Sequence, residues 1–341
     1  MNLIKTEEAV GQVLCHDVTQ IIKGVIKDAV FRKGHIITEA DIPLLLSLGK
    51  DHVYIWEITE GMLHEDDAAD ILRQICQGAD MHPTPPKEGK IELVAGIDGL
   101  FIVDVERLRA VNSLGEMMIA TRASGFPVKK GDKLAGTRVI PLVIEKEKME
   151  RARQVAGNAP LLRLLPFRAR KYGLITTGNE VFHGRIQDTF SPVVREKMAR
   201  YDCEMVRHEI LDDNHEKITA AINAMLAEGA EMVFCTGGMS VDPDDKTPLA
   251  IKNTGASIVS YGAPVLPGAM FLIAYTADGR PVCGLPGCVM YAGYTIFDLV
   301  LPKLLADVPV TTQWLAGLGN GGMCLNCTEC RYPNCMFGKG V

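Results

Sequence analysis

The sequence has no excess of positive charge, no apparent secretory leader and no long unbroken apolar run. Lysine and arginine number 36 against 42 aspartates and glutamates, so the net charge is −6. Because nucleic acids and anionic membranes are bound through clustered positive charge, we expect neither as a partner. The opening MNLIKTEEAVG lacks an apolar h-region, and the most apolar stretches are interrupted by proline and glycine or carry Asp298. We therefore expect no membrane span and a cytoplasmic location.

The signatures of ordinary nucleotide-binding folds are missing as well. The chain contains neither a Walker phosphate loop nor the G-x-G-x-x-G pattern, and no repeat at a solenoid period is visible. What is present is the composition of an ordinary globular protein, with 47% apolar and 23% charged residues. The length of 341 residues predicts two domains, since one domain usually takes roughly 100–200 residues.

The pattern of apolar residues changes near the middle of the chain. Residues 1–165 combine short strand-like runs with an amphipathic helix at 64–80, which predicts a strand-rich α+β module. Residues 168–308 alternate buried strands with helices, which predicts an α/β domain: a three-layer, doubly wound and mostly parallel sheet. We interpret the basic stretch at 145–171 as a solvated helix face and linker. The alternative is a cationic rim that attracts a phosphorylated ligand.

Four loops of the α/β region fall where open α/β sheets bind ligands, beyond the carboxyl ends of the strands. They combine glycine with acids or hydroxyl groups, at 176–188, 211–214, 236–245 and 284–287. The Gly237–Gly238 pair follows a strand, so its backbone could approach a phosphate or pyrophosphate closely. The alternative is a tight turn that needs only the backbone freedom of glycine.

Several carboxylates are expected at the same edge of the sheet. They belong to Glu180, Asp188, Asp212, Asp242, Asp244 and Asp245. Carboxylates around a phosphate site commonly hold magnesium, which takes one or two protein oxygens and keeps several waters. Helix N-capping is the alternative for each of them. The two interpretations are balanced for Asp244 and Asp245, and capping is preferred for the neighbouring Asp213.

Six short motifs of this region occur in a recognisable order. They are TTGNE at 176–180, QDTFS at 187–191, ILDD at 210–213, TGGMSVDPDD at 236–245, PG at 267–268 and GLPG at 284–287. On these motifs, residues 170–306 resemble the molybdopterin-binding domain shared by molybdopterin adenylyltransferases and molybdopterin molybdenumtransferases, the gephyrin-like family. The resemblance implies a role in molybdenum cofactor biosynthesis. In that family the transferase ligates molybdate to the dithiolene of adenylylated molybdopterin with magnesium and releases AMP.

Carried over by position, the resemblance implies a role for each motif. Molybdopterin would be bound by Thr177, Gly178, Gly237, Gly238, Ser240 and Gly287. Catalysis would depend on Glu180, Asp188 and Asp245. Magnesium would be held by Asp242 and Asp212.

The sequence also departs from the family pattern. The family usually has lysine on both sides of the PG pair, but the neighbours here are Leu266 and Ala269. Cys288 stands where asparagine is expected, and no S-A-M-D-G-Y-like run occurs in residues 1–165. These departures favour an alternative function, a non-catalytic carrier or sensor that hands the cofactor to a molybdenum or tungsten oxidoreductase. The family further implies a homo-oligomer.

The last segment, 309–341, holds four of the ten cysteines. Cys324, Cys327, Cys330 and Cys335 follow the spacing C-x2-C-x2-C-x4-C. Four clustered thiols in a cytosolic protein usually bind a metal, so we expect zinc or an iron–sulfur cluster, with the looser last spacing favouring zinc. The glycine-rich leader GLGNGG predicts a tethered knob outside the core.

Overall fold

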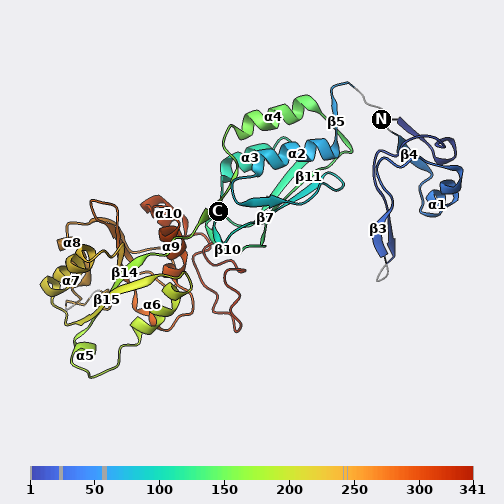
Figure 1. Cartoon of the computed structure of the whole chain (residues 1–341). Coiled ribbons are helices and arrows are strands. Elements are labelled where there is room, and N and C mark those ends of the chain that lie inside the picture. The colour runs from blue at the N-terminus through green and yellow to red at the C-terminus, as the bar shows by residue number, and fades with distance from the viewer. Residues whose placement is uncertain (1, 23–25, 56–59, 241, 244, 341) are drawn as a thin grey trace. The chain divides into compact units, whose positions relative to one another are not determined.

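The computed structural model describes residues 2–22, 26–55, 60–240, 242–243 and 245–340. The chain divides into two compact units (Figure 1). The first unit contains residues 1–96, 103–122 and 130–163, and the second contains residues 97–102, 123–129 and 164–341. None of the helices in the described residues combines the length and apolar character needed to cross a membrane.

The first unit begins with short strands around a small core. Strand β1 (Asn2–Lys5) pairs antiparallel with β4 (His52–Ile55), and β2 (Val18–Ile22) pairs antiparallel with β3 (Ile26–Phe31). Helix α1 (Ile42–Ser47) packs Leu45 into that core. A capping box between Thr38 and Asp41 fixes the turn that leads into this helix.

The rest of the first unit is an antiparallel sheet with helices. The sheet has the order β6-β7-β11-β9, and a separate pair joins β5 to β12. The strands are β5 (Met62–His64), β6 (Met81–Pro83), β7 (Lys90–Ala95), β9 (Met117–Thr121), β11 (Lys133–Val139) and β12 (Val143–Glu145). The helices are α2 (Glu65–Cys76), α3 (Val105–Asn112) and α4 (Lys146–Ala156). This arrangement is the strand-rich α+β module that the sequence predicts.

The second unit is built on a six-stranded sheet of order β15-β14-β16-β19-β18-β17. Four neighbouring strands run parallel, and β18 and β17 close one side antiparallel. The strands are β14 (Lys171–Thr177), β15 (Glu204–Leu211), β16 (Met232–Thr236), β17 (Ser257–Tyr261), β18 (Leu272–Tyr275) and β19 (Pro281–Leu285). A further small sheet joins β10 (Phe126–Val128), β8 (Gly99–Val103) and β13 (Leu162–Pro166).

Helices cover both faces of the six-stranded sheet. One core contains side chains of α6 (Phe190–Ala199) and α9 (Ile296–Leu305), and the other contains side chains of α7 (His215–Ala227) and α8 (Thr247–Asn253). All five residues of β16 are buried, as a strand between two helical layers requires. The predicted three-layer, mostly parallel α/β fold is therefore confirmed.

The C-terminal tail is part of this unit and not a tethered knob, so that expectation is wrong. Helix α10 (Thr312–Gly317) is followed by Leu318 and later by Phe337, which are both buried in the same core as α9. The ring of Tyr332 stacks on Tyr294 with 4.2 Å between centroids. The aromatic side chains of the tail supply enough apolar surface to hold it against the domain, and this outweighs the flexibility of the glycine-rich leader.

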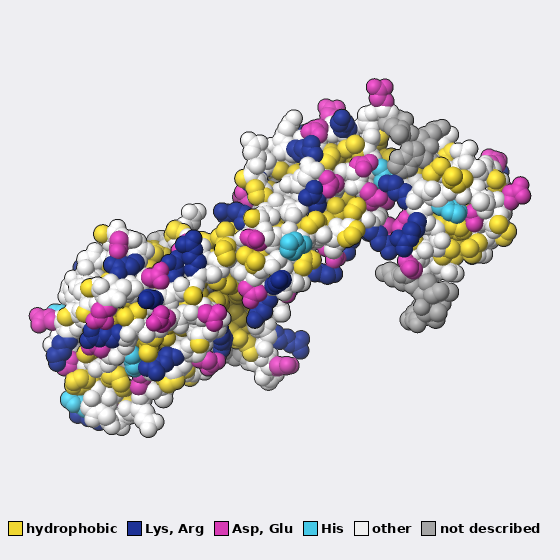
Figure 2. Space-filling view, viewed as in Figure 1, with side chains coloured by type: hydrophobic (Ala, Val, Ile, Leu, Met, Phe, Trp, Pro, Cys, Tyr) yellow, Lys and Arg dark blue, Asp and Glu magenta, His cyan; other side chains and the backbone are white. Residues whose placement is uncertain are grey.

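Charged side chains of both signs are interspersed over the face of the molecule seen in Figure 2. One ion pair lies inside the second unit instead. Lys197 Nζ is 2.5 Å from Asp298 Oδ1, and the two side chains are only 5% and 8% exposed. Lys197 also donates to the carbonyl of Gly293, while Asp298 accepts from the backbone N–H of Thr295. The pair therefore joins α6 to the beginning of α9.

We predict that Lys197→Met strongly destabilises the second unit. The variant leaves Asp298 buried without its cation, a change that usually costs about 3–5 kcal/mol. Urea unfolding followed by circular dichroism measures the loss. Arg200→Gln is the matched control on the same helix, because it removes an exposed pair with Glu196 and should leave the midpoint nearly unchanged. Equal midpoints for the two variants would contradict the prediction.

A second buried acid makes the stability of the first unit depend on pH. Burial raises the pKa of Glu65 to about 7, with repulsion from Asp66 adding to the shift. The folded state therefore keeps a proton that the unfolded chain releases near its ordinary pKa. Stability is full at low pH, falls as the pH rises from about 4.5 to 7, and stays lower above that range.

Glu65→Gln should remove this pH dependence, because glutamine resembles the protonated acid and does not ionise. At pH 8 the variant should be more stable than the parent by on the order of 3 kcal/mol, with little difference at pH 4. Thermal unfolding at the two pH values checks the prediction. Glu145→Gln, which changes an exposed acid, is the control. The same pH slope in parent and Glu65→Gln would show that Glu65 is ionised in the folded state.

Candidate functional site

The carboxyl ends of the parallel strands bring all four predicted loops to one edge of the sheet. In the register of the sheet, Thr177 lies opposite Leu211, and Thr236 lies opposite Thr176 on one side and Leu285 on the other. The loops that follow β14, β16 and β19 therefore begin side by side, and the loop after β15 begins next to that of β14. We call this region the carboxyl edge.

The Gly237–Gly238 turn is packed tightly against the end of β14. Both residues have positive φ, +85° and +55°. A Cβ at Gly237 would collide with the carbonyl oxygen of Thr177, and one at Gly238 would lie 2.9 Å from the Thr247 hydroxyl oxygen. Thr247 in turn donates to the Gly237 carbonyl at 2.9 Å. Packing and backbone conformation thus both require glycine at 237, as the tight-turn alternative expects.

The same turn also leaves backbone donors for a ligand. Among the hydrogen bonds between described residues, none is donated by the amides of Gly238 and Met239. The next amide, that of Ser240, donates to Asp245 Oδ2 at 2.8 Å. Successive backbone N–H groups in a turn form a concavity that suits an anion. The tight turn and the phosphate site are therefore compatible interpretations of one feature.

The loop that carries Asp242 and Asp245 folds back on itself. The Asp245 amide donates to the Asp242 carbonyl at 3.0 Å, and the Tyr261 hydroxyl donates to the Met239 carbonyl at 2.9 Å. Asp242 and Ser240 are exposed, whereas Asp245 is half-buried. Asp244 lies outside the described residues.

Asp188, a predicted catalytic residue, accepts hydrogen bonds at the start of helix α6 (Phe190–Ala199). Its Oδ1 accepts from the amides of Phe190 and Ser191 at 2.9 and 3.0 Å. Burial opposes ionisation of this carboxyl, but hydrogen bonding by the Ser191 side chain, together with the two amides, outweighs it and holds the pKa of Asp188 below its ordinary value. Helix α6 begins at Phe190, directly after its N-cap residue Thr189.

His208 lies beside the predicted residue Asp188, and the sequence analysis does not single it out. Its Nε2 lies 3.0 Å from Thr176 Oγ1 and 3.5 Å from Asp188 Oδ2, and Arg195 faces its Nδ1 at 3.1 Å. Burial lowers the pKa of His208 and Arg195 lowers it further, against the opposite effect of Asp188. His208 stands in the middle of β15 and outside every motif, so only its place beside β14 reveals it.

Carboxylates crowd together on the other side of the Thr177 loop. Burial raises the pKa of Asp213, and repulsion from nearby acids adds to the shift. These acids are Glu180, Asp245 and Asp212. Asp213 Oδ2 accepts from the Asn179 amide at 3.0 Å. Asp213 is therefore not the N-cap of α7, contrary to the expectation. That role belongs to Asn214, whose side chain accepts from the amides at 216 and 217.

One oxygen in this acidic group stands out. Asp212 Oδ2 pairs with Lys217 Nζ at 2.7 Å, but Oδ1 is buried and has no hydrogen-bond partner among the described residues. An unsatisfied buried carboxylate oxygen is unfavourable unless a cation or donor satisfies it. The donor set of carboxylate oxygens is the one that magnesium prefers.

The remaining predicted binding residues flank the same edge. Gly178 follows β14 with a φ of +139°, and its amide donates to the Leu211 carbonyl at 3.2 Å. Gly287 begins a short 3₁₀ turn after β19, and a Cβ there would meet nothing within 4 Å. Cys288, at the position where the family has asparagine, is half-buried, and burial raises its pKa.

No three histidine, cysteine, aspartate or glutamate side chains in the described part of the chain are arranged as ligands of one metal ion. The cysteines of the tail differ in their surroundings. Cys324 and Cys335 are partly buried against the core, while Cys327 and Cys330 are exposed.

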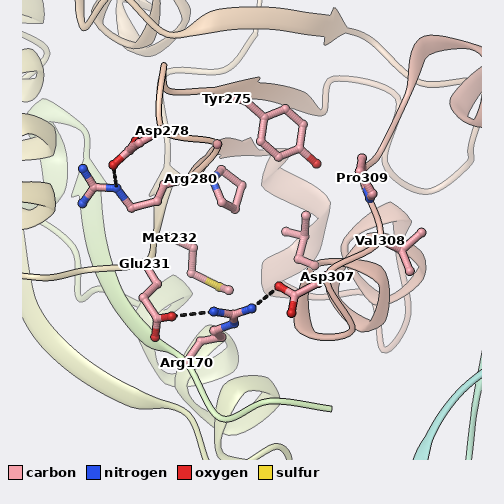
Figure 3. Close-up of a pocket in the computed structure, with 12 residues that line it drawn as sticks. Arg170, Glu231, Met232, Tyr275, Asp278, Arg280, Asp307, Val308 and Pro309 are labelled. Atoms are coloured by element: carbon pink, nitrogen blue, oxygen red, sulfur yellow. Dashed lines mark hydrogen bonds and ion pairs between the residues drawn. The ribbon is translucent and has the colours of Figure 1, made fainter. Parts of the chain in front are cut away.

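The opposite edge of the sheet has a hollow of its own, of about 380 Å³ (Figure 3). There Arg170 donates to Glu231 at 2.5 Å and also pairs with Asp307. Arg280 pairs with Asp278 at 2.8 Å. The charge of Arg170 is thus compensated by the carboxylates of Glu231 and Asp307. Arg170 also lies at the amino ends of the strands, away from the carboxyl edge. It therefore does not contribute to a cationic rim for a phosphorylated ligand, the alternative interpretation of the basic stretch at 145–171.

The fold and the carboxyl edge define an α/β domain in which a glycine turn and a group of carboxylates lie beyond the ends of parallel strands. Comparison with known proteins shows what this domain is similar to. Residues 173–306 match the family described as "Probable molybdopterin binding domain". Residues 3–57 match a second family, described as "Domain of unknown function (DUF8806)".

Among curated proteins, the molybdopterin molybdenumtransferase of Haemophilus influenzae is 26% identical over 202 residues, which cover 57% of this chain and 47% of that protein. The molybdopterin molybdenumtransferase of Synechococcus elongatus is 25% identical over 196 residues, which cover 54% of this chain and 46% of that protein. The chain thus spans about half the length of these relatives.

Solved structures with a similar fold include the molybdopterin biosynthesis enzyme MoaB of Thermus thermophilus. It has 20% identity and a TM-score of 0.33, and the match covers 41% of this chain and 98% of that one. The tungsten cofactor synthesizing protein MoaB of Pyrococcus furiosus has 21% identity and a TM-score of 0.33. The match covers 40% of this chain and 92% of that one.

We predict that Gly237→Ala destabilises the second unit by at least about 2 kcal/mol, because alanine at positive φ is strained and its Cβ has no room beside Thr177. Gly287→Ala is the matched control at the same edge and should melt like the parent. Differential scanning calorimetry compares the two. A parent-like melt for Gly237→Ala would mean that the turn relaxes easily, and any loss of ligand binding in that variant could then be attributed to the ligand contact.

Proposed function

We propose that this chain binds molybdopterin or adenylylated molybdopterin at the carboxyl edge and acts in molybdenum cofactor biosynthesis. The observation that carries the proposal is the Gly237–Gly238 turn, which offers backbone donors directly beside a group of carboxylates. The pterin phosphate would accept hydrogen bonds from the amides of Gly238 and Met239, with Ser240 at the rim. Thr177, Gly178 and Gly287 would form the walls on either side.

The acidic group suits magnesium. Asp212 and Asp242 would hold the ion, since Asp212 has a buried oxygen without a partner among the described residues and Asp242 is exposed beside the turn. When bound, magnesium would neutralise charge on the phosphate or adenylyl group. Glu180, Asp188 and Asp245 would act on the substrate itself, and Asp188 is already fixed for such a role by the start of α6.

The finer proposal is insertion of molybdate, with release of AMP from the adenylylated pterin. The retained acids support it. Positive charge for the anionic substrate would come from Lys217 and Arg195, which lie at this edge through their contacts with Asp212 and His208. The product would pass to a molybdenum or tungsten oxidoreductase, and a homo-oligomer is part of the same proposal.

A second candidate function is a non-catalytic molybdopterin carrier or sensor. It is favoured by Leu266 and Ala269, the apolar side chains that occupy the positions where the family usually has lysine. The side chain of Leu266 is 53% exposed. An apolar side chain therefore stands next to the PG pair at 267–268, where the family usually has a positively charged lysine. A carrier would bind the pterin through the Gly237–Gly238 turn without releasing AMP.

We predict that Asp245→Asn lowers the release of AMP from adenylylated molybdopterin, molybdate and magnesium by at least about 100-fold, since loss of one charge at a metal–phosphate site removes several kcal/mol of transition-state stabilisation. The asparagine side-chain oxygen can still accept from the Ser240 amide, so the loop should keep its shape. Asp278→Asn, at the opposite edge, is the matched control and should be as active as the parent.

Three outcomes separate the alternatives. Parent-like turnover by Asp245→Asn would contradict a catalytic role for that acid. Pterin binding by the parent chain without AMP release under any metal condition would establish the carrier function. Absence of pterin binding in equilibrium dialysis would overturn the proposed ligand.

A further inference from the structure

The four tail cysteines lie within one closed loop of the chain. The Gly338 amide donates to the Gly321 carbonyl at 2.9 Å and so joins the two ends of the loop. Cys324 follows the first end by three residues, and Cys335 precedes the second end by three. Three residues span at most roughly 10 Å, so each of these two cysteines lies within about that distance of the closed base of the loop. Cys327 and Cys330 lie on the stretch between them.

The closed loop is anchored to the domain at both arms. On the first arm the Leu266 amide donates to the Gly322 carbonyl, and the Cys324 amide donates to the Leu266 carbonyl, both at 2.8 Å. On the second arm, the Tyr332 hydroxyl donates to the Asp298 carbonyl at 3.2 Å, and Phe337 is buried. The backbone near Cys324 and Cys335 is therefore held in place, and both side chains pack beside the same core.

The middle of the loop has much weaker attachments. Cys327 and Cys330 are exposed, and the ion pair between Arg331 and Glu329 is also exposed, with 3.7 Å between its atoms. The four thiols do not surround one point, so binding would require this middle stretch to fold inward. Because the loop is already closed at its base, ordering it around an ion loses less chain entropy than ordering a free tail would.

We propose that the loop from Gly321 to Gly338 binds one zinc ion through Cys324, Cys327, Cys330 and Cys335. Four thiolates complete the tetrahedral shell that structural zinc prefers. Two ligands come from the anchored arms and two from the exposed middle. Each thiol loses its proton on binding, so uptake of zinc releases protons to the solvent. The bound ion fixes the tail against α9 and against the Leu266 segment.

The arrangement favours zinc over a four-iron cluster. The last interval of four residues and the proline before the final cysteine depart from the ferredoxin run, which has three residues there and a proline after the cysteine. Such clusters also commonly take one ligand from a distant segment, whereas all four thiols here belong to one short loop. Zinc accepts the looser spacing, because the geometry of a d¹⁰ ion is set by its ligands.

Metal analysis of the full chain purified without oxygen and without an affinity metal tests the proposal. We expect about one zinc ion per chain and no acid-labile sulfide. Cys327→Ser and Cys330→Ser should each lose most of the zinc, and because both side chains are exposed, the substitutions leave the core intact. Cys203→Ser, which changes a half-buried cysteine outside the loop, is the matched control and should keep the metal.

A second readout does not depend on copurified metal. Zinc added to chelator-treated chain should release protons and protect the tail from trypsin at Arg331, and neither effect should occur in Cys327→Ser. Iron with labile sulfide would overturn the assignment to zinc. The proposed site would be overturned if all four thiols titrated freely in the presence of added zinc. It would also be overturned if Cys327→Ser bound as much zinc per chain as the parent. Each of these results is independent of whether the carboxyl edge binds a pterin.

Discussion

Parallel pairing of β14 with both of its neighbours is the constraint on which the rest of the second unit depends. It places Thr176 opposite Ile210 of β15 and Thr236 of β16. Three chain segments that are far apart in sequence therefore end together, and the loops that follow must share one edge. Because those loops cannot pair with a further strand, their polar groups are satisfied by one another, by water or by a ligand. The chemistry of the domain is thus concentrated at this edge by topology before any particular side chain is considered.

Close packing then makes the edge rigid. The hydroxyl of Thr177 lies 3.2 Å from that of Thr247, and both residues are buried between the two loops. The backbone of Gly237 fits into the remaining space, so a larger residue would push the loops apart. A ligand site built on such a turn needs little reorganisation to present its amides. A change that widens the turn would therefore lower the stability of the second unit and, under the proposed function, also weaken ligand binding.

The sequence reveals the architecture better than the details of the caps. Long buried runs such as β14 and the alternation of strand and helix predict the sheet, and the position of loops after parallel strands predicts the edge. The start of each helix is less secure, because Asp188, Asp213 and Asn214 are equally good caps by composition and only the backbone geometry selects among them. The aromatic residues of the tail follow no motif or periodic pattern in the sequence. Their packing against a helix that is distant in sequence therefore cannot be predicted from the neighbouring residues. His208 escapes for the same reason, since its partners Thr176 and Asp188 belong to other segments.

The acids of the edge fall into two electrostatic kinds, and the difference suggests how the site works. Asp188 is stabilised as an anion by backbone donors at the start of α6, so its charge is compensated within the fold. Asp213 lies among carboxylates that repel it, and Asp212 has a buried oxygen that no described residue satisfies. Repulsion of this kind destabilises the edge, and a bound divalent cation would relieve it. The compensated acid can therefore hold a fixed geometry, while the uncompensated group is the part of the edge at which the proposed magnesium ion and its anionic ligand would bind.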